Sequence, residues 1–102
     1  MLIYNTTYVV DKNRQNAWKI WINETHIPYM NKTGKFDYYQ TTKILFPENS
    51  DNTESFSVQF KIKDLEMLGV WSELHAEELQ NEISGLFGKD VLPFSTVMEI
   101  ID

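Results

Sequence analysis

Hydrophobic and polar residues follow either a period of two or a helical spacing along most of the chain. Alternation over residues 2–10 predicts a first strand, and helical spacing over 12–27 predicts a helix that Asp11 caps. Glu24 lies at the edge of the core face expected for this helix. Because Pro28 has no amide hydrogen, we expect the helix to end or kink there. The residues expected on the core face are Ala17, Trp18, Trp21, Thr25 and Pro28.

Two more strands are predicted in the middle of the chain. Gly34 supplies a turn, residues 36–46 form the second strand, and 47–54 form a polar loop. The third strand has the clearest alternation, with four apolar residues on one side and polar residues on the other. The apolar residues are Phe56, Val58, Phe60 and Ile62, and the polar ones are Ser55, Ser57, Gln59 and Lys61.

A second helix and a last strand complete the chain. The helix is predicted over 65–87, with Asp64 as its N-terminal cap and Gly88 as its left-handed C-terminal cap. The last strand is predicted over 91–101. The expected core stripe of the helix is Leu65, Leu68, Ala76, Leu79, Ile83 and Leu86.

The element order β-α-β-β-α-β predicts an α+β fold. Right-handed crossovers and an antiparallel middle hairpin lead to a four-stranded antiparallel sheet with both helices on one face. This is the ferredoxin-like plait, and the 102 residues form one such domain, 1–102.

The sheet face opposite the helices is expected to be partly apolar. In the first strand Ile3, Asn5, Thr7 and Val9 share one side, and neither the first nor the last strand has a uniformly polar side. Such a face would expose several hundred Å² of apolar surface, which monomers seldom do. We therefore predict a homodimer joined through the open sheet faces, a dimeric α+β barrel. The alternative is a monomer with a solvent face of mixed polarity. Three apolar residues of the second helix also lie away from its core stripe: Met67, Val70 and Leu74.

Composition narrows the possible partners. The chain has 9 basic and 15 acidic residues, a net charge of −6, which disfavours nucleic acids and anionic membranes. There is no cysteine, so disulfides and thiolate metal sites are excluded. We find no signal-peptide pattern and no apolar run of about 18 residues, and we expect a cytoplasmic protein.

Several segments carry a family resemblance. The chain resembles a family of small bacterial proteins known only as a domain of unknown function and assigned to the dimeric α+β barrel superfamily. The resemblance supports the fold and the dimer and implies no activity. Its segments are residues 1–5, Trp18-x-x-Trp21, Glu24-x-His26-Ile27-Pro28, Thr33-Gly34-x-Phe36, Val58-Gln59-Phe60, His75-Ala76 and Leu79-Gln80.

The architecture is more distantly similar to antibiotic-biosynthesis and haem-degrading monooxygenases. That similarity implies a pocket between sheet and helices. In the haem-degrading group an asparagine of the first strand accompanies a tryptophan and a ligating histidine of the second helix, as Asn5, Trp71 and His75 would here. Trp71 and His75 are only four residues apart, closer than in that group's pattern. We expect no cofactor.

Five residues are candidates for chemistry or cofactor binding, each with a structural alternative. His75 is a ligand or general base, or else a histidine at the edge of the core. His26 binds a cofactor, or else interacts with the helix dipole near a helix end. Glu24 is an acid or base of raised pKa, or else the ion-pair partner of a lysine such as Lys35 or Lys43.

Asn5 lines a pocket or forms a hydrogen bond at the dimer face, and Trp71 walls a ligand site or belongs to the core. With no cysteine and no His-x-x-x-His, no metal site is expected.

Two functions remain open. The first is a non-catalytic dimer that binds a small molecule, such as an apolar one, or another protein. The second is a cofactor-independent or haem-dependent monooxygenase-like enzyme, or an isomerase-like one, using His75, Asn5 and Glu24. An enclosed cavity of about 300 Å³ or more, with His75 and Asn5 pointing into it, favours the enzyme. A core filled by the tryptophans favours the binding protein.

Overall fold

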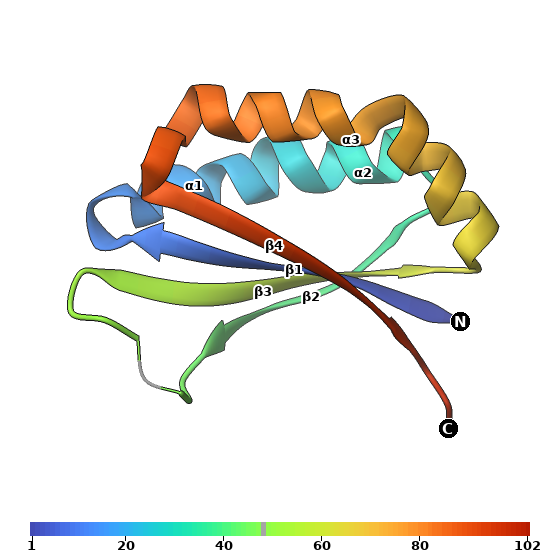
Figure 1. Ribbon diagram of the computed structural model, residues 1–102, viewed down its shortest axis with the longest axis horizontal. Coiled ribbons are helices and arrows are strands. Elements are labelled where there is room, and N and C mark those ends of the chain that lie inside the picture. The colour runs from blue at the N-terminus through green and yellow to red at the C-terminus, as the bar shows by residue number, and fades with distance from the viewer. Residues whose placement is uncertain (48) are drawn as a thin grey trace.

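The computed structural model describes residues 1–47 and 49–102 as a layer of helices on a four-stranded sheet (Figure 1). The strands are β1 (Leu2–Asp11), β2 (Asp37–Ile44), β3 (Thr53–Ile62) and β4 (Val91–Glu99). The helices are the 3-10 turn η1 (Lys12–Arg14), α1 (Gln15–Trp21), the π-helical turn η2 (Ile22–His26), α2 (Ile27–Thr33), α3 (Leu65–Phe87) and the 3-10 turn η3 (Gly88–Asp90).

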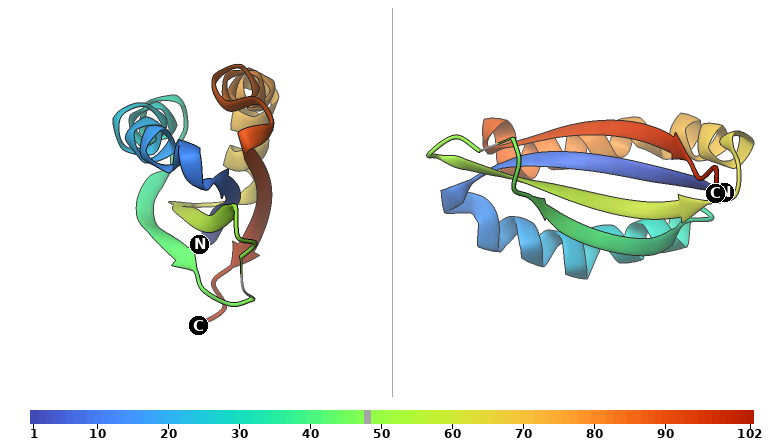
Figure 2. Two further views of the ribbon diagram at one scale, coloured as in Figure 1. Left: turned by 90° about the vertical axis from the view of Figure 1, so that its left-hand side faces the viewer. Right: turned by 90° about the horizontal axis from the view of Figure 1, so that it is seen from below.

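The sheet is antiparallel throughout and has the strand order β2-β3-β1-β4. Its centre pairs β1 with β3 over ten residues, from Leu2 opposite Ile62 to Asp11 opposite Thr53. In the end-on view of Figure 2, both rows of helices lie on the same side of the sheet. The predicted class, an α+β fold with an antiparallel sheet and two helices, is therefore confirmed. The second and last strands are shorter than predicted and end at Ile44 and Glu99.

Strong local signals placed several elements correctly. Asp11 accepts a hydrogen bond from the amide of Asn13, and Asp64 accepts one from the amide of Met67, as N-terminal caps do. Gly88 ends α3 with a φ of 55°, a conformation that other residues rarely adopt. Alternation in β3 is also confirmed, because Phe56, Val58, Phe60 and Ile62 are all buried under the helices.

The first helical segment differs from prediction, because it passes through Pro28 and continues to Thr33. In the π turn just before Pro28, the amide of Ile27 bonds the carbonyl of Ile22. A wider turn relieves the clash between a proline ring and the preceding helical turn. A π turn also contains more residues than an α turn. Residues spaced by four along this segment therefore stay on one face, whereas in a regular α-helix each step of four residues rotates by about 40°.

This change of phase alters which residues are buried. His26 is buried, whereas Glu24, Thr25 and Pro28 are exposed, so the predicted core face is wrong beyond Trp21. Ala17 is exposed as well. The buried residues of the segment are Trp18, Trp21, Ile22, His26 and Met30.

The core stripe of α3 is also partly corrected. Leu68, Ala76 and Leu79 pack against the core and Ile83 is buried, but Leu65 and Leu86 are exposed at the two ends of the helix. Trp71 and Phe87 are buried instead. Ile83 and Phe87 are four residues apart and share the inward face of the helix, so Leu86 is turned away from the core, and Leu65 is the first residue of the helix.

Aromatic rings fill the space between the layers. Trp18 stacks on Phe56 with ring centroids 4.9 Å apart, and Phe36 meets Trp71 edge to face at 5.2 Å. Gly34 permits this close approach, because a Cβ there would lie 2.5 Å from the Phe36 ring and 3.0 Å from Trp71. The tryptophans therefore form part of a filled core.

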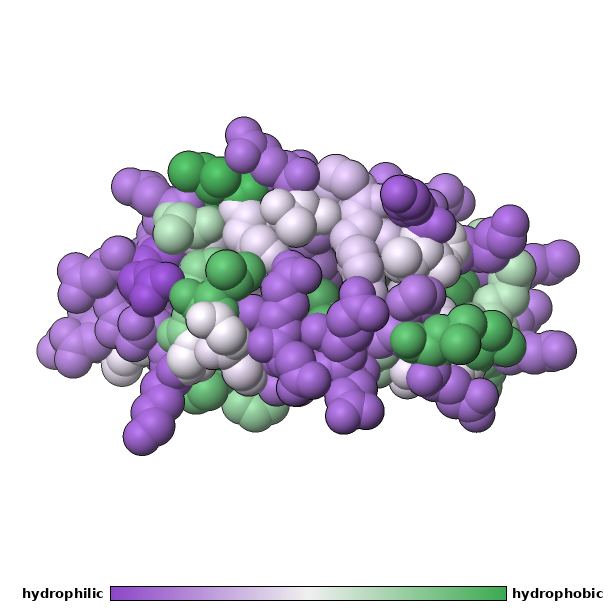
Figure 3. Space-filling view, turned by 90° about the horizontal axis from the view of Figure 1, so that it is seen from above, coloured by the Kyte–Doolittle hydropathy of each residue, from purple (hydrophilic) through white to green (hydrophobic). Residues whose placement is uncertain are grey.

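The outer side of the helical layer is mainly hydrophilic. Seen from above in Figure 3, apolar patches are separated by hydrophilic side chains. None of the described helices combines the length and apolar character needed to cross a membrane.

Candidate functional site

The open face of the sheet, on the side away from the helices, is curved. In the end-on view of Figure 2, β2 and β4 curve downward on either side of β1 and β3. Three residues at the centre of this face, Ile3, Asn5 and Ser57, are only 8%, 9% and 7% exposed although no helix covers them. The curvature of the strands therefore desolvates the centre of an otherwise open face.

A chain of hydrogen bonds crosses all four strands at this level. Asn5 donates to the Thr96 hydroxyl at 3.2 Å and accepts from the Ser57 hydroxyl. Gln59 donates to Ser57 at 3.3 Å, and Gln40 donates to the Gln59 carbonyl oxygen at 3.2 Å. We call these five residues the polar ladder. Because its members satisfy one another, burying this level of the sheet against another surface leaves few polar atoms without a partner.

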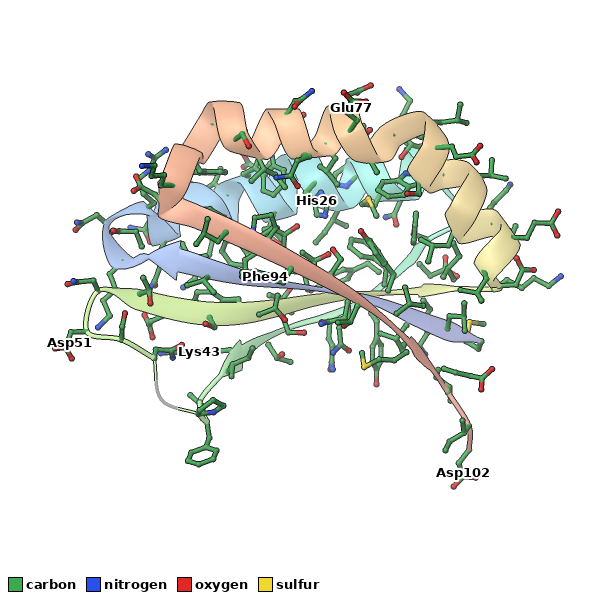
Figure 4. All side chains as sticks on the ribbon, viewed as in Figure 1. His26, Lys43, Asp51, Glu77, Phe94 and Asp102 are labelled. Atoms are coloured by element: carbon green, nitrogen blue, oxygen red, sulfur yellow. The ribbon has the colours of Figure 1, made fainter. Side chains whose placement is uncertain are left out.

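Apolar side chains surround the ladder, chiefly on the outer strand β4. Phe94, which Figure 4 labels midway along β4, is 59% exposed. The register places it opposite Thr7, on the open side of the sheet. Four large, exposed apolar residues on β4 or just after it lie on this open side of the sheet: Leu92, Phe94, Met98 and Ile100. They form an apolar rim beside the ladder.

Charges on the strands described lie toward the ends of this face. The register places Asp11 at one end and Asp37 opposite Lys61 near the other. The Lys61 ammonium lies 4.5 Å from the centre of the Tyr39 ring, a cation–π contact. The middle of the open face is therefore uncharged, as the core of a protein–protein interface usually is.

His26 lies on the opposite side of the sheet, between the helices and the strands (Figure 4). It is 3% exposed, and its ring stacks on Trp21 with centroids 4.8 Å apart. Nε2 is 3.5 Å from the Tyr8 hydroxyl, and the buried Nδ1 has no partner. Burial lowers the pKa of His26 to about 4, so the imidazole is neutral near pH 7. Burial likewise raises the pKa of Tyr8, and the phenol stays protonated.

His75 lies between α2 and α3 and is half-buried. Its ring meets Tyr29 edge to face at 6.0 Å and lies 6.2 Å from Trp71. Burial, followed by the carboxylates of Glu78 and Glu82, raises the pKa of Tyr29.

The remaining candidates lie apart from each other. Glu24 is exposed, so its predicted place at the edge of the core is wrong, because the π turn rotates it outward. The lysine predicted as one of its partners, Lys43, pairs with Glu54 instead. Trp71 donates to the Thr33 hydroxyl at 3.0 Å and belongs to the core.

A small cleft lies between α3 and the strands β1 and β4, where a monooxygenase pocket would be expected. Its volume is about 190 Å³, and hydroxyl groups of Tyr4, Thr6 and Ser95 line it. Tyr4 donates to Ser95 at 3.3 Å, and Thr6 and Ser95 are 3.0 Å apart. Neither Asn5 nor His75 is among the residues that line it. The volume is below the range of about 300–1,000 Å³ that is usual for ligand pockets.

The residues do not fit a haem site. A shared pocket would need Asn5, Trp71 and His75 on one side of the sheet. Asn5 instead belongs to the open face, whereas Trp71 and His75 lie in the helical layer. Among the residues that the structure describes, no group of three or more His, Asp or Glu side chains could hold a metal ion.

The polar ladder is the feature that sequence analysis missed. Only Asn5 was singled out, as a residue that lines a pocket or forms a hydrogen bond at the dimer face. Ser57 and Gln59 were correctly predicted to face away from the core, but nothing in the sequence linked them to Asn5. Polar residues lie opposite one another in the first, third and last strands. This pattern can be recognised only when the register between the strands is known.

Comparison with known proteins identifies a family without an assigned role. No curated protein and no solved structure matches the chain. One family model, described as "Domain of unknown function (DUF4286)", matches residues 1–101. The chain therefore belongs to this DUF4286 family of domains of unknown function.

Proposed function

We propose that this chain is a non-catalytic homodimeric protein with a ferredoxin-like fold, whose open sheet face binds that of a second copy. The element order and the strand order β2-β3-β1-β4 support the ferredoxin-like assignment. The single observation that carries the dimer is the open face itself, an uncharged centre with a self-satisfied polar ladder beside an exposed apolar rim. Two such faces would close a dimeric α+β barrel.

The size of the face suits this role. Nine paired residues at about 3.3 Å each make strands roughly 30 Å long, and four strands about 4.8 Å apart make a sheet roughly 19 Å wide. The projected area is then roughly 600 Å², and side-chain relief brings the accessible area toward the roughly 800 Å² per partner of a stable interface.

The geometry favours binding over catalysis. The cleft between sheet and helices is about 190 Å³, and neither Asn5 nor His75 lines it. The tryptophans Trp18 and Trp71 are buried in a filled core. These features are the ones expected of a binding protein. A small apolar ligand and a cytoplasmic location stay predictions from the sequence.

Light scattering at micromolar concentration tests the dimer. We expect a mass of about twice 12.0 kDa for the wild-type chain. In Phe94→Glu, a charge would replace an apolar contact in the interface, and we expect the dissociation constant to rise at least about 100-fold, equivalent to about 3 kcal/mol.

Val97→Glu is the matched control. Val97 lies three residues along the same strand, is 43% exposed, and pairs with Tyr4 on the helical side of the sheet. We expect this variant to remain dimeric, and circular dichroism checks that both variants fold. A wild-type mass of 12.0 kDa would overturn the proposal. Equal dissociation by the two variants would overturn the choice of face.

A further inference from the structure

The two outer strands of the sheet differ in how their free edges are protected. β2 carries the charged residues Asp37 and Lys43, and its register with β3 shifts between Tyr38 and Gln40. Charges and bulges of this kind discourage an outer strand from pairing with another chain. β4, the outer strand on the opposite side, has no charged residue from Val91 to Met98. Its edge is therefore the one better suited to accept a further strand.

Alternate residues of β4 direct their backbone groups away from the sheet. The amide of Ile100 donates to the carbonyl of Met1 at 3.0 Å, so the backbone groups of Ile100 point toward β1. Because this direction alternates along a strand, even-numbered residues of β4 bond to β1 and odd-numbered residues point outward. Pro93 agrees with this pattern, since proline is tolerated where its missing amide hydrogen would face solvent. We call the outward backbone groups beyond Pro93 the β4 edge, which comprises Ser95, Val97 and Glu99.

The β4 edge is accessible in the folded protein. Its three residues are exposed, and Val97 is 43% exposed. Figure 1 shows the reason, because α3 and β4 are adjacent at η3 and then diverge, so the helix leaves the second half of the strand uncovered. The edge lies in the plane of the sheet, whereas the proposed dimer would bury the open face perpendicular to it. Pairing along the edge is therefore an interaction separate from the dimer.

The cleft between α3 and β4 lies beside this edge, on the helical side of the sheet. Pro93 and Ser95 line it from β4, and Leu79 and Gln80 line it from α3. Its volume of about 190 Å³ is small for a whole ligand, but it has room for about six water molecules of about 30 Å³ each. That space suits a single large side chain. A residue paired with Ser95 would lie on the same side of the sheet, about 5 Å from it and next to the cleft.

An edge with free backbone groups beside a side-chain pocket is the combination by which sheets bind extended peptides. The backbone hydrogen bonds supply affinity, and the pocket selects one side chain of the peptide. Hydroxyl groups of Tyr4 and Thr6 meet that of Ser95 in the cleft, where apolar side chains of α3 also lie. A tyrosine matches this lining best, because its ring is apolar and its hydroxyl needs a hydrogen-bond partner.

Charge favours a segment of another protein over a second copy of this chain. Each copy has a net charge of −6, so two copies repel each other. The open face can offset that repulsion with a broad apolar contact, but the narrow edge offers no comparable area. Glu99 instead attracts a basic side chain on the strand opposite, and Val97 favours an apolar one.

We propose that the β4 edge binds an extended segment of a partner protein as a fifth, antiparallel strand. The segment has a basic residue opposite Glu99, an apolar residue opposite Val97, and a tyrosine opposite Ser95 whose side chain enters the cleft. Antiparallel pairing is chosen because it is the more stable arrangement. In that direction the three residues occupy alternate positions of the segment, in the order basic, apolar, tyrosine.

Amide signals in nitrogen–proton correlation spectra provide a site-specific test. In the free protein we expect the amides of the β4 edge to exchange with solvent at least about tenfold faster than those of the residues between them. The probe is the peptide Thr-Lys-Thr-Val-Thr-Tyr-Thr with both ends blocked. On addition of the probe, we expect saturable shifts of the amides of Ser95, Val97 and Glu99 and slower exchange at the same three positions.

Two N-methylated peptides form a matched pair. Methylation of the valine amide removes a hydrogen that faces β4, so binding should weaken at least about tenfold. Methylation of the threonine just before the valine removes a hydrogen that faces away, and the affinity should stay within about twofold. Alanine in place of the peptide's tyrosine leaves the cleft empty and should weaken binding about tenfold.

Variants of the protein test the same geometry from the other side. Val97→Pro removes an outward amide hydrogen that β1 does not use, so the sheet should form as it does with Pro93, while peptide binding falls at least about tenfold. Glu99→Lys should weaken binding about fivefold. Glu77→Lys is the matched control, because Glu77 lies on the outer side of α3 and should not affect the peptide (Figure 4).

Three results would overturn the proposal. They are the absence of saturable shifts at the β4 edge, equal binding of the two N-methylated peptides, and edge amides already protected in the free protein, which would mean that a second copy occupies the edge. Light scattering on the same samples separates this proposal from the dimer. A dimer that does not bind the peptide overturns the edge proposal alone, and a 12.0 kDa particle that binds it overturns the dimer alone.

Discussion

The covered and the open face of the same four strands bury polar atoms in different ways. On the covered face, aromatic and aliphatic side chains fill most of the space, and some buried polar atoms have no partner, such as the indole nitrogen of Trp18 and Nδ1 of His26. On the open face, Asn5 and Ser57 are nearly as buried, but they belong to a continuous ladder. Helices therefore exclude water from one face. On the other face the curvature of the strands buries polar side chains, and their hydrogen bonds to one another lower the cost of that burial.

The difference between the faces has a consequence for stability. Burial of apolar area on the covered face supplies most of the driving force for folding. The polar ladder contributes less to the free energy of folding. Because its polar atoms already have hydrogen-bond partners, a second protein can cover the open face at a low cost in desolvation. Neighbouring residues of β3 should therefore differ sharply when they are truncated.

The largest expected effect compares Phe60 with Gln59. Phe60 is 1% exposed under the helices, so Phe60→Ala should lower the free energy of unfolding by about 3–5 kcal/mol. Gln59 lies on the ladder, and Gln59→Ala should cost only about 0.5–1.5 kcal/mol. Urea denaturation followed by circular dichroism measures both. Similar losses in the two variants would contradict the contrast between the faces.

An intermediate effect is expected for Asn5→Ala. This change leaves the buried Ser57 hydroxyl and the Thr96 hydroxyl without their shared partner. We expect a loss of about 1–3 kcal/mol in the free energy of unfolding, because the buried Ser57 hydroxyl loses its acceptor and keeps only the donor Gln59. Thr7→Ala is the control, since Thr7 only accepts a 3.4 Å bond from Asn5. A loss no greater than that of the control would show that the ladder is not coupled.

The smallest effect concerns His26 and pH. Its folded-state pKa of about 4 is below the ordinary value of about 6.5, so the unfolded chain binds a proton more readily. The stability that His26 contributes is complete above about pH 6.5 and is lost progressively as the pH falls toward about 4. Between about pH 6.5 and about pH 5.5 we expect a loss of about 1 kcal/mol.

Denaturation of wild type and His26→Phe at both pH values isolates this contribution. Phenylalanine retains a flat ring against Trp21 but cannot bind a proton. The pH dependence should therefore be weaker in the variant by about 1 kcal/mol. An unchanged dependence would mean that His26 becomes accessible to water before the chain unfolds.

Local signals in the sequence predicted most of the architecture. Alternation from Phe56 to Ile62 predicted the buried side of β3, and Asp64 and Gly88 marked the ends of α3, because each depends on backbone geometry within a few residues. Signals that assumed a regular helix were less reliable. The exposure of Thr25 and Glu24 and the burial of His26 follow from a π turn that no local pattern indicated.

The candidate site was predictable only in part. Asn5 was recognised as an unusual strand residue and as a possible hydrogen-bonding group at the dimer face. The sequence could not show that Ser57 and Thr96, 52 and 91 residues away from it along the chain, would bond to it. Cross-strand pairing sets those partners, and the register of a sheet is decided by the packing of all its strands together.

The amino-acid sequence by itself determined the order of strands and helices, the caps of α3 and the apolar side of β3, since hydrophobic periodicity and capping act over short distances. Tertiary structure alone decided that His26 is buried beside Trp21, that Asn5 and His75 lie in different layers, and that polar residues of four strands join into one ladder. These features depend on contacts between distant segments. A pattern read along one segment has no access to them, because the partner of each side chain is chosen only when the layers pack.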